Sequence, residues 1–160
     1  MNKIAHFYKV SKTQFSLDAK EELYGDIILP KRATIGSAGY DFFAPYSFTL
    51  LPNESIKIPT GIRVKIENGW VLCIFPRSSL GFKYRLTLNN TVGVIDSDYY
   101  FAENEGHIFI KMTNCGNAPL SVEKGKAFAQ GVFFPFGITD NDECETLRHG
   151  GLGSTDKKTF

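Results

Sequence analysis

The sequence predicts an all-β protein, and three features point to that class. Short apolar runs are separated by turn signals such as Asn68-Gly69. Aromatic residues are frequent, with 14 Phe and 7 Tyr, and so is glycine, with 15. Aromatic side chains favour strands, and glycine favours tight turns. Short strands with closely spaced turns are typical of an antiparallel sandwich or barrel.

Four segments carry the strand pattern. Residues 62–66 alternate between apolar and charged side chains, which is the period of a half-buried strand. Residues 70–75 are a short apolar run that ends at Pro76. Because Asn68-Gly69 lies between these two runs, we expect them to form a hairpin. The expected strands are residues 62–66, 70–75, 107–112 and 127–134.

The two ends of the chain differ from this pattern. Residues 11–23 are the best helix candidate, with Ser11 as its N-cap. From Thr139 onward the sequence is polar, and residues 149–155 contain closely spaced glycines. The sequence therefore predicts one domain over residues 1–138 and a flexible C-terminal arm over residues 139–160.

Composition excludes several classes of protein. A chain of 160 residues is the usual size of one domain. Its net charge of +1 argues against a nucleic-acid surface. Cys73, Cys115 and Cys144 form no C-x-x-C pair, which fits a reducing compartment. The N-terminus has no signal-peptide pattern, and no run is long and apolar enough for a membrane span. We expect a cytoplasmic protein with no nucleic-acid or membrane partner.

Residues 76–81, Pro-Arg-Ser-Ser-Leu-Gly, follow an apolar strand directly. Arg77 offers a planar fork of donors that suits phosphate, and Ser78 and Ser79 add two hydroxyls. Gly81 lets a backbone approach an anion. The alternative is an ordinary polar turn after a strand.

Residues 93–99, Gly-Val-Ile-Asp-Ser-Asp-Tyr, place two acids two positions apart after an apolar pair. In an extended segment Asp96 and Asp98 share one side. A carboxylate near phosphates can act as a general base or hold a metal-bound water. Tyr99 offers a flat face for a sugar or a base. The alternative is an acidic turn with Tyr99 in the core.

Three further segments are weaker when read alone. Residues 37–41 are small residues followed by Asp41, and an ordinary turn would look the same. The backbone N–H groups of residues 150–155 could wrap phosphates or belong to a disordered terminus. Gln130 lies in an apolar strand and needs a polar partner if it is buried.

Taken together and in this order, five segments resemble the motifs of the trimeric dUTPase family, especially of dUTPases from Gram-positive bacteria and their phages. The segments are residues 38–41, 76–81, 90–99, 125–130 and 148–155. The similarity covers residues 27–155. It implies a distorted jelly-roll-like antiparallel β-barrel, a homotrimer with active sites shared between subunits, and Mg²⁺-dependent hydrolysis of dUTP to dUMP and pyrophosphate.

The resemblance also implies a role for each matching residue. Asp96 would be the general base that activates the water attacking the α-phosphorus. Asn90 and the 90–96 hairpin would read uracil, and Tyr99 would pack on the deoxyribose and exclude a 2′-hydroxyl. Asp41 would support the metal and phosphate region, and Mg²⁺ would be held by the triphosphate and waters without a direct protein ligand. The implied substrate-binding residues are Arg77, Ser78, Ser79, Gly81, Asn90, Gly93, Val94, Ile95, Tyr99, Gln130, Arg148, Leu152, Gly153, Ser154 and Thr155.

Two departures from the family pattern keep alternatives open. Leu152 stands where the family arm usually has an aromatic residue, so stacking on the base is lost. An extra loop over residues 100–105 precedes Gly106 and is either a site for a regulatory protein partner or surface decoration. The alternatives for the whole chain are a homologue of dCTP deaminase and a regulatory dUTP-binding protein.

Overall fold

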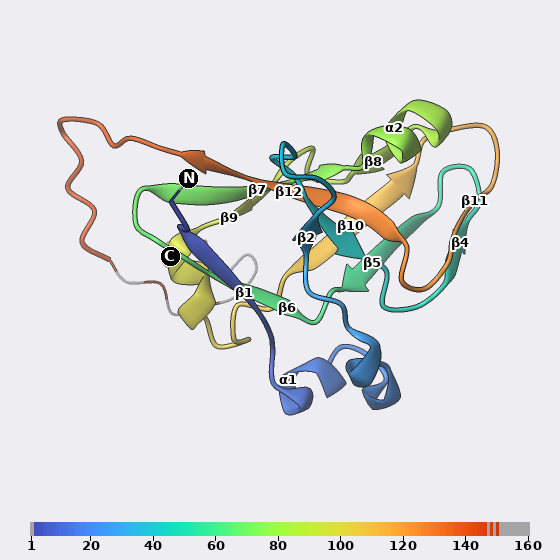
Figure 1. Cartoon of the computed structure of the whole chain (residues 1–160), viewed down its shortest axis with the longest axis horizontal. Coiled ribbons are helices and arrows are strands. Elements are labelled where there is room, and N and C mark those ends of the chain that lie inside the picture. The colour runs from blue at the N-terminus through green and yellow to red at the C-terminus, as the bar shows by residue number, and fades with distance from the viewer. Residues whose placement is uncertain (1, 147, 149, 151–160) are drawn as a thin grey trace, which may run out of the picture.

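The computed structural model describes residues 2–146, 148 and 150. The strands are β1 (Ala5–Lys9), β2 (Lys31–Arg32), β3 (Tyr40–Phe43), β4 (Phe48–Leu50), β5 (Ser55–Pro59), β6 (Ile62–Ile66), β7 (Trp70–Pro76), β8 (Leu86–Leu88), β9 (Gly93–Ile95), β10 (Phe109–Asn114), β11 (Leu120–Val122) and β12 (Ala127–Pro135). The helices are α1 (Lys12–Ser16), α2 (Ser78–Tyr84) and two 3₁₀ segments, η1 (Glu21–Asp26) and η2 (Ser97–Phe101). Figure 1 shows the short helices at the periphery of the strands.

Every strand pairing in the described part of the chain is antiparallel, and the strands form four sheets. The largest sheet has the order β2-β3-β12-β7-β9, and another has the order β5-β10-β8. The all-β antiparallel class is therefore confirmed. None of these sheets, as described, closes on itself as a barrel. No helix within the described residues is long and apolar enough to cross a membrane.

The hairpin expected at Asn68-Gly69 is wrong, although both strands lie where they were predicted. The turn exists, with Gly69 at φ +82°. However, β6 pairs with β1, and β7 lies between β12 and β9. The chain changes sheet at this turn, because each strand finds its backbone partners elsewhere. The hairpin expected at residues 90–96 is wrong for the same reason, since β8 pairs with β10 whereas β9 pairs with β7.

The helix expected over residues 11–23 is broken into two short pieces. Ser11 is the N-cap of α1, and its hydroxyl accepts a hydrogen bond from the Gln14 N–H. The α-helix ends at Ser16, and η1 begins at Glu21. Leu17, just after α1, is exposed. The segment has no continuous apolar face to bury, so a longer helix gains nothing from packing.

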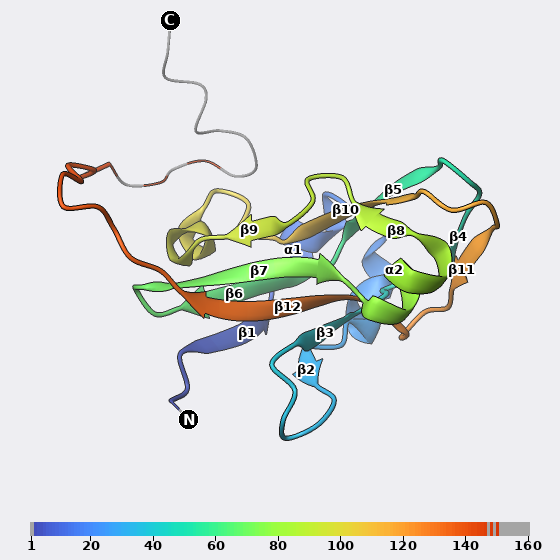
Figure 2. The same cartoon turned by 90° about the horizontal axis from the view of Figure 1, so that it is seen from above.

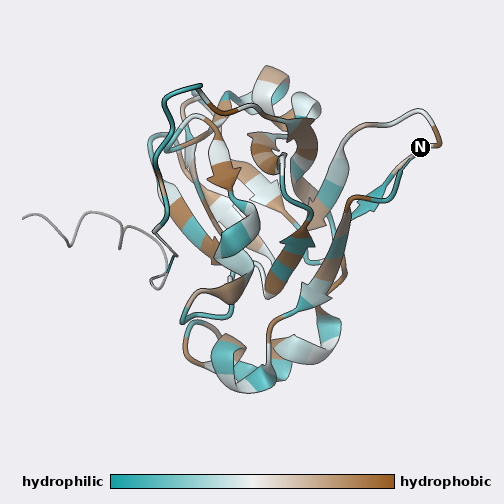
Figure 3. Ribbon diagram, turned by 90° about the vertical axis from the view of Figure 1, so that its left-hand side faces the viewer, coloured by the Kyte–Doolittle hydropathy of each residue, from teal (hydrophilic) through white to brown (hydrophobic). Residues whose placement is uncertain are grey.

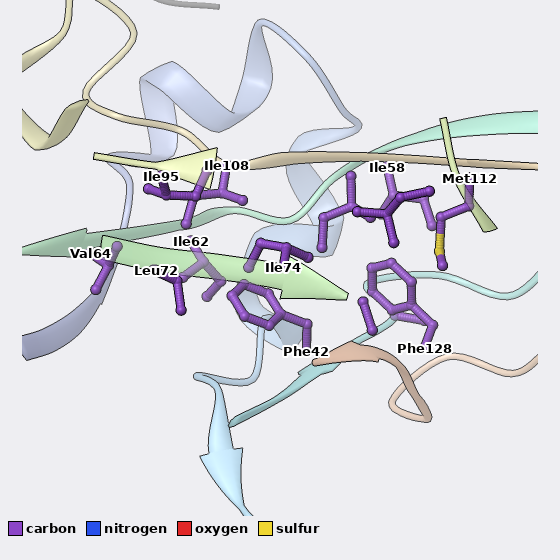
Figure 4. Close-up of a cluster of buried hydrophobic side chains, with 14 of the residues drawn as sticks. Phe42, Ile58, Ile62, Val64, Leu72, Ile74, Ile95, Ile108, Met112 and Phe128 are labelled. Atoms are coloured by element: carbon purple, nitrogen blue, oxygen red, sulfur yellow. The ribbon is translucent and has the colours of Figure 1, made fainter. Parts of the chain in front are cut away.

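The core lies between the sheets and is built from alternate residues of the strands. Figure 4 shows side chains from β3, β5, β6, β7, β9, β10 and β12 meeting there, and hydropathy alternates along several strands in Figure 3. Phe42, Ile58, Leu72, Ile74 and Phe128 are almost completely buried. Because β7 contributes to this core along its length, its two ends are fixed relative to each other.

Candidate active site

A cavity of about 330 Å³ lies at the C-terminal end of β7. Its lining brings together residues that are far apart in the sequence, from β3, β12 and the start of α2. The lining residues are Ala33, Ser37, Gly39, Asp41, Arg77, Ser78, Ser79 and Gln130. The cavity therefore unites the first, second and fourth of the segments that the sequence singled out.

The sheet fixes the polar groups of this cavity through backbone pairing. In the ladder Gln130 of β12 lies between Asp41 of β3 and Phe75 of β7. The Gln130 side-chain amide donates to the Pro76 carbonyl over 3.2 Å. This bond is the polar partner that the sequence analysis expected for a buried Gln130. Arg77 follows β7 directly, and its Nε lies 3.2 Å from Oδ1 of Asp41. The half-buried carboxylate holds the guanidinium, which remains 40% exposed, at the cavity.

Gly39 is required by the close approach of Gln130. A Cβ at position 39 would lie 2.8 Å from Oε1 of Gln130. Such a contact is too short for a carbon and an oxygen, so a larger residue here would displace the amide. The small residues of the 37–41 segment thus leave room for a polar side chain inside the cavity.

A second polar cluster follows β9. Asp96 and Asp98 are both half-exposed, and Arg148 binds them together. Nη2 of Arg148 lies 2.6 Å from Oδ2 of Asp96, and its Nε lies 2.9 Å from Oδ1 of Asp98. Charge-assisted contacts of this kind are the stronger hydrogen bonds in proteins. The two acids share Arg148, but the expected extended segment is wrong: Asp96 is the N-cap of η2 and Asp98 lies within it.

Tyr99 lies beneath this cluster and is only 5% exposed. Its hydroxyl donates to the His107 carbonyl over 2.8 Å and accepts from the Asn104 amide over 2.9 Å. The guanidinium of Arg148 lies 5.8 Å from the ring centroid. Burial raises the pKa of Tyr99, and the hydrogen bond from Asn104 and the charge of Arg148 oppose that rise. The hydroxyl of Tyr99 is therefore hydrogen-bonded inside the molecule, while its ring lies next to the guanidinium of Arg148.

The turn before β9 presents Asn90 to solvent. Thr91 adopts a left-handed conformation with φ +61°, and the Val92 N–H donates to the Asn90 carbonyl. Gly93 opens β9 opposite Ile74, and a Cβ there would lie 3.1 Å from Cβ of Ile74. Glycine lets β9 pack closely on β7, which sets the position of Asp96 three residues later.

The two clusters lie toward opposite ends of β7. Ile95, next to Asp96, pairs with Leu72, whereas Arg77 follows Pro76. Leu72 and Pro76 are four residues apart, which is about 13 Å along a strand at about 3.3 Å per residue. Figure 2 shows α2 beyond the arrowhead of β7 and the yellow segment after β9 toward its start. The cavity and the acidic cluster are thus separate sites within one chain.

The structure therefore joins some of the expected site residues and separates others. Arg77, Ser78, Ser79, Gln130 and Asp41 meet in the cavity, whereas Asp96, Tyr99 and Arg148 meet around η2. Gly81 lies within α2, and Val94 is exposed on β9. Leu152, Gly153, Ser154 and Thr155 lie outside the described residues. Sequence reasoning did not assign roles to Ser37 or Asn104, whose only signal was their place inside or beside a motif.

Comparison with known proteins gives a consistent set of relatives. A family model described as dUTPase matches residues 25–156. The deoxyuridine 5′-triphosphate nucleotidohydrolase of Lactococcus lactis is 46% identical over 132 residues, which is 81% of this chain and 88% of that protein. The protein of the same name from Haemophilus influenzae is 39% identical over 138 residues, again 81% of this chain and 88% of that protein.

Solved structures agree with these relatives. The crystal structure of the dUTPase from Streptococcus mutans is 38% identical, with a TM-score of 0.67, and the match covers 84% of this chain and 98% of that one. A dUTPase from phage phi11 of S. aureus, solved to show how it coordinates a structural Mg(II) ion, is 20% identical with a TM-score of 0.67, over 90% of this chain and 98% of that one. The phage protein shows that the jelly-roll-like fold is shared. The family model, the curated relatives and the streptococcal structure together show that this chain belongs to the dUTPase family.

Proposed function

We propose that the protein hydrolyses dUTP to dUMP and pyrophosphate, which lowers the dUTP level and supplies the precursor of dTTP. The observation that carries this proposal is the cavity lined by Arg77, Ser78, Ser79 and Gln130, in a chain of the dUTPase family. A guanidinium, two hydroxyls and an amide are donors suited to the oxygens of a polyphosphate. The curated relatives are named for the same reaction.

Asp96 is the proposed general base. Its carboxylate is half-exposed, so a water molecule can reach it. It accepts the proton as that water attacks the α-phosphorus, and pyrophosphate leaves with the electron pair of the broken P–O bond. Arg77 and its hydroxyl neighbours hold the phosphates in line and offset the charge of the transition state. Asp41 acts indirectly, by orienting Arg77 through their ion pair.

The turn at residues 89–92 and the strand β9 form the proposed uracil site. Asn90 is exposed there, and the backbone of residues 93–95 reads the polar edge of the base and leaves no room for the 5-methyl group of thymine. The ring of Tyr99 packs on the deoxyribose. Its buried position leaves the ring little freedom to move away from an added 2′-hydroxyl.

Mg²⁺ is the proposed cofactor, carried on the triphosphate. No group of three or more His, Cys, Asp or Glu side chains among the described residues is placed to bind a metal ion. In the cavity, the carboxylate of Asp41 is already ion-paired with Arg77, and the other donors suit phosphate. This donor set fits a metal that phosphate oxygens and waters coordinate. Once bound, Mg²⁺ neutralises part of the phosphate charge.

We propose a homotrimer in which subunits share each active site. The separation of about 13 Å along β7 keeps Asp96 and Arg77 of one chain from acting on the same phosphorus. The outer face of β12-β7-β9 carries an apolar row, in which Val132, Cys73 and Val94 lie side by side. Val94 is 59% exposed, and Phe134 on the same sheet is 43% exposed. Exposed apolar surface on a sheet is typical of a subunit contact.

Residues 1–138 form the proposed catalytic domain, and residues 139–160 form an arm that completes a site. Arg148, Leu152, Gly153, Ser154 and Thr155 cover the nucleotide and bind its γ-phosphate end in this proposal. In the structure Arg148 binds Asp96 and Asp98 of its own chain. Its guanidinium must therefore leave these carboxylates before it reaches a phosphate.

The activity is tested by pyrophosphate release from dUTP, dTTP, dCTP and UTP, each with and without Mg²⁺. We expect release from dUTP with Mg²⁺ and little from the other nucleotides. Ammonia release from dCTP would instead identify a deaminase. Nucleotide binding without pyrophosphate release would identify a regulatory dUTP-binding protein, and either result overturns the proposal.

Sharing of the sites is tested by mixing two variants of strongly reduced activity, Asp96→Asn and Arg77→Gln. After unfolding and refolding together at equal amounts, about one quarter of all sites carry both native residues, if these residues come from different subunits. We expect recovery of about that fraction of wild-type turnover. No recovery in mixed trimers would place both residues of a site on one chain.

A further inference from the structure

The loop over residues 100–106 turns the side chains of Asn104 and Glu105 inward, onto the chain itself. Asn104 and Glu105 are half-buried and hydrogen-bonded within the molecule, whereas Phe101 and Glu103 are exposed. A loop that only decorated the surface would leave such groups to water. Its internal contacts instead lead to Tyr99.

Asn104 holds the phenol of Tyr99 in a defined hydrogen-bonding arrangement. The Gly106 N–H donates to Oδ1 of Asn104 over 3.2 Å, so the amide nitrogen faces the phenol. That nitrogen donates to Oη of Tyr99 over 2.9 Å. The hydroxyl of Tyr99 must then donate its own proton to the His107 carbonyl, 2.8 Å away. The phenol is thereby held from two sides.

The loop that carries Asn104 is itself fixed. The carboxylate of Glu105 accepts from the backbone N–H and the hydroxyl of Ser11, over 2.7 and 2.6 Å, and Arg63 lies 3.7 Å away. Partial burial acts to raise the pKa of Glu105, but the Ser11 hydrogen bonds and the Arg63 charge outweigh it and lower the pKa. At Gly106, with φ +68°, a Cβ would lie 2.6 Å from the Tyr99 carbonyl. The loop therefore closes tightly on η2 and joins it to α1.

We propose that Asn104 is a positioning residue that fixes the ring of Tyr99 and so sets the preference for deoxyribose over ribose. This inference rests on the proposed function, in which that ring packs on the sugar. Because the hydroxyl of Tyr99 donates one hydrogen bond and accepts another, the ring is held in place and does not shift toward the core. The ring then stays where a 2′-hydroxyl would have to fit. The loop serves the site of its own chain through this contact.

The test is Asn104→Leu, which keeps the size of the side chain and removes its donor. We expect the ratio of kcat/KM for dUTP to kcat/KM for UTP to fall about five- to tenfold, the effect of losing about one hydrogen bond. Most of the change lies in a higher kcat/KM for UTP, a readout that a purely structural role would not move. Glu103→Gln is the matched control in the same loop, and its ratio stays at the wild-type value. Thermal unfolding checks that both variants fold.

A double-mutant cycle with Tyr99→Phe shows whether Asn104 acts through the phenol. The Phe variant lacks Oη, so adding Asn104→Leu to it causes little further fall in the ratio. Effects that add in the double mutant would mean that Asn104 acts elsewhere. A folded Asn104→Leu variant with the wild-type ratio would also overturn the inference.

The two proposals fail in different ways. A wild-type chain that releases no pyrophosphate from dUTP overturns the proposed function, and the positioning role with it. A wild-type chain that prefers dUTP over UTP, beside an equally selective Asn104→Leu variant, overturns the positioning role alone.

Discussion

The two polar clusters of this chain are built in different ways. In the cavity, Asp41 and Gln130 occupy facing positions of paired strands, so the backbone ladder holds their side chains. Asp96 instead follows the last residue of β9, and the η2 segment beside it depends on side-chain contacts from Arg148 and Asn104. In the proposed function, the cavity that binds phosphate is therefore held by a sheet. The proposed general base lies instead on a short, half-exposed element, whose position depends on a few side-chain contacts.

The largest expected effect distinguishes the proposed catalytic role of the acidic cluster from the proposed binding role of the cavity. Asp96→Asn keeps the size of the side chain and removes the base, so dUTP turnover falls about a thousandfold, within the usual range for a general base. Nucleotide binding is retained because the cavity is untouched. Steady-state pyrophosphate release and dUTP-analogue binding measure the two effects.

Asp98→Asn is the matched control, because this acid shares Arg148 but follows no paired strand directly. We expect only a severalfold loss of turnover from it. Equal losses from the two variants would show that the pair acts as a unit and that Asp96 has no special role.

The next effect concerns the cavity alone. Arg77→Gln removes a charged donor, so kcat/KM for dUTP falls about ten- to a hundredfold, as expected for a hydrogen bond to a charged group. Arg85→Gln is the control, since Arg85 is an exposed arginine at the other end of α2. A similar loss in the control would point to general electrostatic attraction of the nucleotide instead of a specific contact.

A smaller effect tests how closely the sheet fixes the cavity. In Gly39→Ala the new Cβ meets Oε1 of Gln130, so the amide must move and KM for dUTP rises about two- to fivefold. The free energy of unfolding changes little, because the atom displaced is the end of a side chain. Gly36→Ala is the control, since nothing lies within 4 Å of a Cβ there. An unchanged KM in Gly39→Ala would show that Gln130 does not touch the substrate.

The smallest effect is a pH dependence of stability that arises beside η2. Burial lowers the pKa of His107 below its ordinary value of 6.5, although the facing Asp18 opposes this; Lys57 and Glu105 are the other charged groups nearby. The unfolded chain therefore takes up a proton near pH 6.5 that the folded chain takes up only at lower pH. The free energy of unfolding accordingly falls as the pH drops below 6.5, by at most about 1.4 kcal/mol per pH unit for this one proton.

Denaturant unfolding between pH 7 and 5 measures this slope. Glu105, whose folded pKa is also lowered, adds a loss of the same sign at more acidic pH. His107→Gln makes the curve flatter near pH 6. An unaltered slope in His107→Gln would assign the pH dependence to other groups.

The sequence by itself determined the class of the fold and the motifs in which the candidate site residues lie. Strand periods, glycine turns and the cap at Ser11 are local, so the extents of β6 and β7 and the start of α1 followed from a few neighbouring residues. The ordered motifs around Arg77 and Asp96 also marked the candidate site residues directly. The predicted extents of β6 and β7 and the start of α1 match the structure because they depend only on the spacing of neighbouring side chains.

Only the tertiary structure decided which strands pair and which motifs meet. The turn at Asn68-Gly69 was visible in the sequence, but its two strands found partners in different sheets, because backbone pairing depends on segments distant in the chain. The same holds for Asn104, whose polar side chain looked like surface until the fold placed it against Tyr99. Long-range packing sets such contacts, and no local pattern encodes them.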